Sequence, residues 1–147
     1  MTATMELLSL GLEHQRAGRF QQAAAAYREV LHSDPDNADA LHLMGMLLYQ
    51  SGRPAEALGW IERALRTSPR VPMFHNNLGT VLLALGRLEE ACAAYRRALE
   101  VDPRYAEAHS NLASVLAGAL RPQRGQITWN PTARRIPPAR RAGMLFQ

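Results

Sequence analysis

Residues 72–105 of the 147-residue chain read PMFHNNLGTVLLALGRLEEACAAYRRALEVDPRY. Apolar side chains recur in this stretch at helical spacing, first in its N-terminal half and again after Gly86, which indicates two amphipathic helices. Gly86 stands where the first helix must stop, because glycine adopts the left-handed backbone of a helix C-terminus at little cost. Pro103 ends the second helix, since proline lacks the N–H that a continuing helix needs. The stretch therefore predicts a helical hairpin.

The same pattern occurs three times with a period of 34 residues. A fixed period of this length is typical of repeat architectures, in which each unit buries its apolar face against its neighbours. Alanine and leucine together supply 45 residues, whereas valine and isoleucine supply 8, which favours helices over strands. Six positions are identical in the three copies: Gly11/Gly45/Gly79, Gly18/Gly52/Gly86, Arg19/Arg53/Arg87, Ala23/Ala57/Ala91, Leu31/Leu65/Leu99 and Pro35/Pro69/Pro103.

At these residues the chain resembles the tetratricopeptide repeat (TPR) family, whose pattern is W-x2-L-G-x2-Y, then A-x3-F, then P. The tryptophan position holds smaller or polar residues here, and the resemblance covers residues 4–120. It implies an all-α fold, a right-handed superhelix (α-solenoid) of stacked helix-turn-helix repeats over 4–37, 38–71 and 72–105, with a partial repeat over 106–120. In the third copy the pattern is carried by His75, Leu78, Gly79, Leu82, Ala91, Tyr95 and Pro103.

Small residues are expected to let the two helices of each repeat pack closely. The first helix carries a recurring glycine, Gly79 in the third copy, and the second helix a recurring alanine, Ala91. Larger side chains at these positions would hold the two backbones apart. At the start of the second repeat, Asp36 or Asn37 is expected to cap the helix that follows Pro35.

A fourth copy begins at Ala106 and stops after its first helix. Leu120 occupies the position of the turn glycine, and no repeat residue is recovered from Gln123 onward. Without a second helix, Leu112, Leu116 and Leu120 would keep some apolar surface in water. Three explanations stay open: a tolerated cap, a surface that binds another chain, or a foreign reading frame after a truncation or frameshift. We favour the last, which the nucleotides after codon 122, read in the other two frames, would test.

The net charge of +4 is an average over two unlike parts. Residues 1–120 hold 11 Arg and 13 acidic residues, a net charge of −2, whereas residues 121–147 hold six Arg and no acid. The Pro- and Arg-rich composition of this basic tail predicts disorder. Nucleic acid is the rival class of partner, since Arg134-Arg135 and Arg140-Arg141 beside Trp129 would contact phosphates and stack a base. One nearby aromatic among six arginines is weak support, so we disfavour that class.

No catalytic or metal-binding arrangement emerges from the sequence. His75 and His109 share one position of successive repeats, so we expect them to replace the packing tryptophan of the family rather than to bind a metal. Cys92 is expected to be a small buried residue, and phosphate-loop and dinucleotide motifs are absent. We expect no enzyme activity and no cofactor. Lacking a signal peptide and an apolar run of about 20 residues, the protein is expected to be cytoplasmic, without membrane contact.

For function there remains the concave surface that first helices line in this family, where its members bind extended peptides or partner segments. The resemblance assigns three residues of each first helix to this surface. The C-terminal half of the surface is rich in amide and hydroxyl side chains. Such groups can hydrogen-bond the main chain of an extended ligand. The surface opens with Leu8, Leu12 and Gln15, and the predicted partner-binding residues are His42, Met46, Tyr49, Asn76, Asn77, Thr80, Ser110, Asn111 and Ser114.

Two resemblances within the family narrow the function. A chaperone-type clamp for a terminal dicarboxylate needs a cation and an amide where the first copy has Leu8 and Leu12, so that function is not expected. Residues 106–116 (AEAHSNLASVL) instead resemble the superhelix that precedes the catalytic region of O-linked N-acetylglucosamine transferases, and Asn77 and Asn111 share one position of successive repeats. The predicted function is a scaffold that binds a protein or peptide. The alternative is the repeat region of a truncated glycosyltransferase.

Overall fold

The computed structural model describes residues 2–120, which form seven helices and no strand. The expected tail of residues 121–147, and with it the nucleic-acid alternative, lies outside the described residues. Consecutive helices pack against each other, which confirms the expected all-α solenoid. The helices are α1 (Thr2–Arg16), α2 (Phe20–Ser33), α3 (Ala38–Gln50), α4 (Pro54–Thr67), α5 (Pro72–Ala84), α6 (Leu88–Val101) and α7 (Ala106–Leu120).

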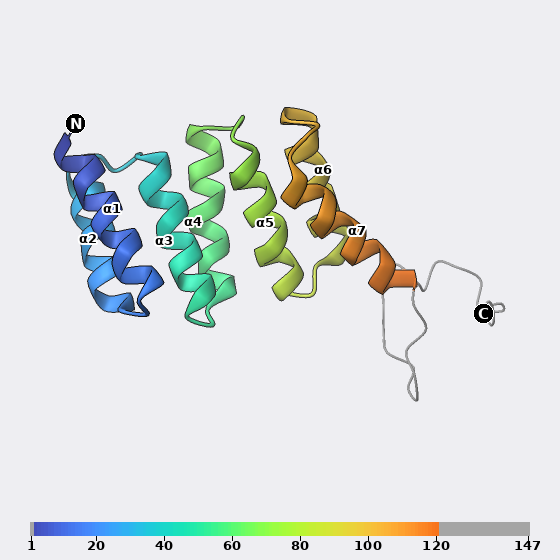
Figure 1. Ribbon diagram of the computed structural model, residues 1–147, viewed down its shortest axis with the longest axis horizontal. Helices are drawn as coiled ribbons and strands as arrows, with labels where there is room; N and C mark the ends of the chain where they lie inside the picture. The colour runs from blue at the N-terminus through green and yellow to red at the C-terminus, as the bar shows by residue number, and fades with distance from the viewer. Residues whose placement is uncertain (1, 121–147) are drawn as a thin grey trace.

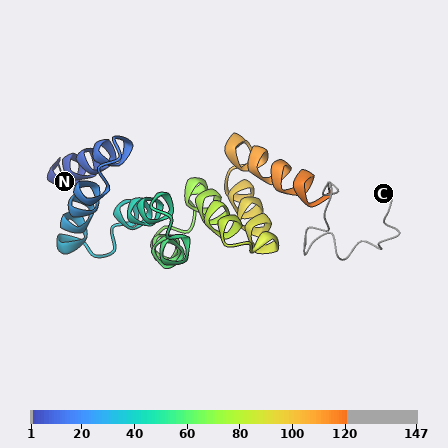
Figure 2. The ribbon, with the colours of Figure 1, turned by 90° about the horizontal axis from the view of Figure 1, so that it is seen from below.

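The helices form a curved row of antiparallel pairs (Figure 1). α1 pairs with α2, α3 with α4 and α5 with α6, and α7 follows as a first helix without a second helix within the described residues. Figure 2 shows α1, α3, α5 and α7 on the inner side of the curve and α2, α4 and α6 on its outer side. The concave face is therefore built from the first helices of the repeats, as the resemblance implies.

A left-handed glycine follows the first helix of each of the three complete repeats. Gly86 has φ of +78°, and the backbone N–H of Arg87 donates to the carbonyl oxygen of Leu82 at 2.9 Å around it. Gly18 and Gly52 have φ of +80° and +81° in the two earlier repeats. The predicted helix stop is confirmed, because a residue with a Cβ adopts this backbone only at a cost.

A second set of glycines lies inside the first helices and has another role. A Cβ on Gly79 would stand 2.6 Å from Cε1 of Tyr95, and a Cβ on Gly45 would stand 2.7 Å from Cγ1 of Ile61. We expected these glycines and the recurring alanine of the second helix to let the two helices pack closely. The main contact of each glycine is the large side chain four residues after that alanine, and Gly45 also approaches the backbone oxygen of Ala57, at 3.2 Å from the added Cβ. The glycine makes room for a large core residue.

Polar side chains mark where helices begin. Arg53 and Arg87 directly precede α4 and α6, and the guanidinium of each forms two hydrogen bonds of 2.7–2.9 Å with the carboxylate three residues later, Glu56 or Glu90. Asn37, rather than Asp36, caps α3, because its Oδ1 accepts a backbone N–H of the first turn at 2.9 Å.

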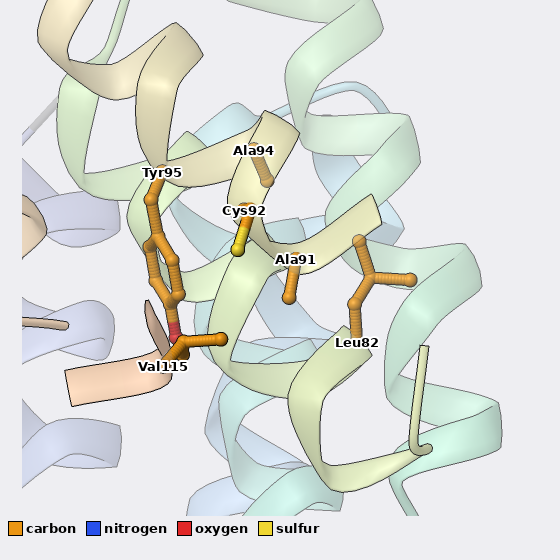
Figure 3. Close-up of a cluster of buried hydrophobic side chains, with 6 residues drawn as sticks. All are labelled: Leu82, Ala91, Cys92, Ala94, Tyr95 and Val115. Carbon is orange, nitrogen blue, oxygen red and sulfur yellow. The ribbon is translucent and has the colours of Figure 1, made fainter. Parts of the chain in front are cut away.

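The apolar core continues from each repeat into the next. Figure 3 shows one of its clusters, where side chains from α5, α6 and α7 converge. Because Val115 of the partial fourth repeat is part of this cluster, α7 is held in place by the core of the third repeat. Cys92 is buried here, as expected. The cluster consists of Leu82, Ala91, Cys92, Ala94, Tyr95 and Val115.

Candidate binding surface

The nine predicted partner-binding residues lie on three first helices of the concave side, three each on α3, α5 and α7. Their burial divides them into three groups. His42 and Asn76 are buried, whereas Ser110 and Ser114 are exposed. The half-buried residues are Met46, Tyr49, Asn77, Thr80 and Asn111.

Polar side chains connect neighbouring first helices with a constant offset of 35 residues. Nδ2 of Asn77 donates to Nε2 of His42 at 2.7 Å, and Nδ2 of Asn111 donates to Oδ1 of Asn76 at 3.0 Å. The repeats have a period of 34. Each buried residue is therefore hydrogen-bonded to the residue that lies one position after its own equivalent in the next repeat. Sequence analysis placed these four residues on one surface, and the structure joins them into two equivalent pairs.

The two pairs are themselves connected through α5. Nδ2 of Asn76 donates to Oδ1 of its neighbour Asn77 at 3.4 Å. A continuous run of hydrogen bonds therefore crosses the concave side from α7 to α3. In order, its members are Asn111, Asn76, Asn77 and His42.

His42 ends this run as an acceptor. Its ring stacks on Phe74, with 4.6 Å between the ring centroids and 26° between the planes. Burial lowers the pKa of His42 from 6.5 to about 4, so the ring is neutral near pH 7. Because an amide nitrogen only donates, Nε2 of His42 carries no proton, and the ring proton lies on Nδ1.

Asn77 and Asn111 keep hydrogen-bonding capacity for a ligand. An amide side chain has two N–H donors and an oxygen with two lone pairs. Within the described residues, Asn77 uses one donor and one lone pair, and Asn111 uses one donor. Since both side chains are half-buried, their remaining capacity is within reach of a partner.

Other predicted partner-binding residues also contact the apolar core. Met46 and Tyr49 pack against the buried cluster that contains Ile61. Oγ1 of Thr80 lies 3.2 Å from the hydroxyl oxygen of Tyr95, which lies in the cluster of Figure 3. These side chains would offer a ligand part of their surface while they stabilise the stack.

The N-terminal end of the concave side contains a polar group that sequence reasoning found only in part. Gln15, which was predicted, is buried. Its Oε1 accepts a hydrogen bond from the hydroxyl of Tyr27 at 2.6 Å, and its amide nitrogen Nε2 donates to Oε1 of Gln50 at 2.8 Å. Gln50 and Phe74 were missed. The pair of Gln15 and Gln50 has the same offset of 35 residues, a signal that becomes visible only when the other pairs are known.

His75 and His109 have the same structural partner in successive repeats. Their Nε2 atoms lie 2.7 Å from the carbonyl oxygens of Pro69 and Pro103, in the turns after α4 and α6. Each ring therefore donates to the turn six residues before it.

In the described range no three potential metal ligands come together. Among the helices of residues 2–120, none has the length and apolar character of a membrane span.

Comparison with known families agrees with this geometry. The family described as "Tetratricopeptide repeat" matches residues 8–72, and the family described as "TPR repeat" matches residues 79–118. Curated protein sequences give no significant match.

Solved structures show the same architecture. A mutant O-GlcNAc transferase of Thermobaculum terrenum aligns with a TM-score of 0.74 and 37% identity, over 78% of this chain but 22% of the enzyme. The first TPR of Spaghetti (RPAP3), bound to an HSP90 peptide, aligns with a TM-score of 0.73 and 22% identity, over 80% of this chain and 93% of that one. MamA aligns with a TM-score of 0.70 and 20% identity, over 78% and 67% of the two chains. The last two likenesses concern the fold alone.

Proposed function

Because the chain belongs to the tetratricopeptide repeat family, we propose that it is a scaffold that binds an extended segment of a partner protein along its concave face. It catalyses no reaction of its own. The principal contacts are the amides of Asn77 and Asn111, which bind the ligand main chain. The other predicted residues of α3, α5 and α7 line the path of the ligand and add weaker contacts.

The observation that carries this proposal is the constant offset of 35 residues in the two hydrogen-bonded pairs. His42 holds Asn77 at 2.7 Å, and Asn76 holds Asn111 at 3.0 Å. Since the buried member of each pair orients the half-buried member, the binding amides lose little conformational freedom when a ligand arrives. Packed helices lie about 8–10 Å apart and an extended peptide advances about 3.3 Å per residue, so one amide would meet about every third ligand residue.

Main-chain recognition fits this surface better than recognition of a carboxylate terminus. Leu8 and Leu12 are half-buried where a dicarboxylate clamp needs a cation and an amide, and Leu8 packs against the core cluster that contains Tyr27. A neutral amide, by contrast, can both donate to and accept from a peptide group, whatever side chain the peptide carries.

The test uses peptides of random sequence, displayed on phage and selected against the full chain. A selected peptide is then synthesised with a fluorescent label, and its dissociation constant is measured by anisotropy. Asn77→Ala and Asn111→Ala should each raise that constant about tenfold, because each removes hydrogen bonding worth about 1 kcal/mol or more. Gln22→Ala is the matched control, since Gln22 is an exposed amide on the outer helix α2; it should leave the constant unchanged.

A second readout separates main-chain from side-chain recognition. Methylating the peptide nitrogen that meets Asn111 should weaken binding to the unmodified protein, and it should have no further effect on the Asn111→Ala variant. Circular dichroism checks that each variant keeps its helices. The proposal fails if selected peptides bind both asparagine variants as tightly as they bind the unmodified chain.

A second candidate function is that of the repeat region of an O-GlcNAc transferase-like glycosyltransferase. The observation in its favour is the 37% identity over 78% of this chain. The alignment spans 22% of that enzyme, so the sugar transfer itself would require a separate catalytic domain, to which this chain would present protein substrates. For either candidate we propose a cytoplasmic site of action, which cell fractionation would check.

The nucleotide sequence tests the second candidate. The nucleotides after codon 122 are translated in the other two frames. Further repeats followed by a glycosyltransferase domain would support it. If neither frame contains them, this candidate is discarded and the scaffold proposal stands unaffected.

A further inference from the structure

α7 has the composition of a covered helix, although no other helix of residues 2–120 covers one of its sides. Its single charged residue is Glu107. The inner helices α3 and α5, which α4 and α6 cover, carry one charged residue and none, whereas α4 and α6 themselves carry four and five. A repeat stack normally ends in a polar outer face. An uncharged outer face on α7 therefore indicates that another surface covers it.

The open side of α7 is formed by His109, Ala113 and Leu116, which we call the terminal stripe. Leu116 is 36% exposed, whereas its equivalent in α5, Leu82, is 5% exposed because α6 lies over it. The terminal stripe thus corresponds to the surface of a first helix that, in each of the three complete repeats, packs against the second helix of the same repeat. The equivalent residues of α5 are His75, Gly79 and Leu82.

Ala113 limits what can cover the terminal stripe. The three complete repeats have glycine at this position, and a Cβ on Gly79 would stand 2.6 Å from the ring of Tyr95. Ala113 carries that Cβ, so a covering helix with an aromatic residue there is held further away. This disfavours helices of the α2 or α6 type, which place Tyr27 or Tyr95 at that point. A helix with small residues opposite the stripe fits better.

We propose that a second copy of the chain covers the terminal stripe, with the two α7 helices antiparallel and Leu116 of each copy over Ala113 of the other. A large residue then meets a small one twice across a two-fold axis, as close helix packing requires. Among the helices of residues 2–120, α7 has two properties together. It has no charged residue beyond its first turn, and the side on which a first helix normally packs against its second helix is exposed. Asn111 lies outside the stripe, so this dimer is independent of the proposed binding function.

The opposite end of the row is less suited to the same contact. Met5 and Leu10 of α1 are 69% and 45% exposed, but Glu6 and Glu13 are exposed beside them and line the same shallow surface hollow. A symmetric contact there would bring like charges together and remove them from water. The comparison favours α7 as the self-associating end.

Sedimentation equilibrium of the full chain tests the proposal. One helix face buries less than the about 1,200 Å² of a standard interface, so we expect a weak dimer and measure up to about 1 mM protein. The weight-average mass should rise with concentration from 16.3 kDa toward twice that value. Leu116→Glu should keep the mass of one chain. Leu83→Glu, at the same exposure of 36% but on α5, is the matched control and should dimerise normally.

A charge exchange tests the antiparallel register. Leu116→Glu and Ala113→Arg should each be monomeric alone, as circular dichroism confirms that both remain helical. In a mixture, the introduced carboxylate meets the introduced guanidinium at one contact, while the other contact keeps Ala113 against Leu116, so dimers should return. Unmodified chain that stays monomeric, as it would if its own tail or another protein covered the stripe, overturns the proposal. So does a dimer that survives Leu116→Glu, or a mixture that stays monomeric.

Discussion

At the scale of single residues, two helical glycines with ordinary backbone angles have opposite surroundings. Gly79 in α5 faces the ring of Tyr95, and an added Cβ would stand 2.6 Å from it. Gly59 in α4 has no atom within 4 Å of the place where a Cβ would stand. The period of 34 distinguishes them in part, because Gly79 recurs in every complete repeat and Gly59 does not. Only the packing shows what Gly79 makes room for.

We predict opposite effects for alanine at these two glycines. Gly79→Ala should lower the free energy of unfolding by about 1–3 kcal/mol, because it overpacks the contact with Tyr95. Gly59→Ala should raise it by about 0.5–1 kcal/mol, because alanine is the better helix former where space is free. Urea denaturation followed by circular dichroism measures both. Equal effects at the two positions would contradict the packing role of Gly79.

His42 predicts a loss of stability in acid. Its pKa is about 4 in the folded chain against 6.5 for a free histidine, so between these values the unfolded chain binds a proton that the folded chain does not. The stability contribution is complete above pH 6.5 and falls as the pH drops toward 4, by about 3 kcal/mol in total. Urea denaturation at pH 7 and at pH 4 measures this loss.

The matched variant for this pH dependence is His42→Leu. Carboxylates titrate in both proteins, so the difference between their acid losses isolates the imidazole. The variant should be less stable at pH 7, where Asn77 has lost its acceptor, and should lose less stability on acidification. Parallel pH profiles for the two proteins would show that His42 is not buried as a neutral ring.

At the scale of elements, each hairpin is specified by signals that lie within one repeat. The left-handed glycine, the arginine after it and the proline after the second helix were all visible in the sequence, and the structure confirms the turn at Gly18, Gly52 and Gly86. The salt bridges of Arg53 and Arg87 link residues only three positions apart. Such local features are predictable because the chain segment itself brings the partners together.

Substituting the turn glycine Gly86 should destabilise the fold for a different reason from substituting the packing glycine Gly79. A Cβ on Gly86 would meet no atom within 4 Å, but the backbone there has φ of +78°. Gly86→Ala should therefore lower the free energy of unfolding by about 1–2 kcal/mol through backbone strain alone. Gly86→Asn should cost less, since asparagine tolerates this conformation better. Thermal denaturation of the two variants checks this order, and a larger loss for asparagine would contradict it.

At the scale of the whole molecule, stability comes from contacts between neighbouring repeats as well as within them. Ile61 is fully buried in a cluster with Ala57 and Val81 that joins the second repeat to the third. Leu10, at the N-terminal end of the row, is 45% exposed. A residue in the middle of a stack therefore supports two units, whereas one on the outer face of a terminal unit supports less.

This difference predicts the effect of truncating each side chain. Ile61→Ala should lower the free energy of unfolding by about 2–5 kcal/mol, because it leaves a cavity in the central core. Leu10→Ala should change it by about 0.5 kcal/mol or less, since its side chain is already largely in water. Urea denaturation of both variants measures the contrast. Similar losses at the two positions would mean that the stack does not depend on its centre.

The sequence by itself determined the period, the hairpins and their turns, because these depend on signals repeated within 34 residues. Which helices form the concave face was implied by the resemblance to the family. Only the tertiary structure decided that His42 holds Asn77, that Asn76 holds Asn111, and that Gln50 belongs to the same pattern. An offset of 35 follows from how far neighbouring helices are shifted along each other. That shift is set by the packing of all their side chains at once, which no segment of the chain encodes alone.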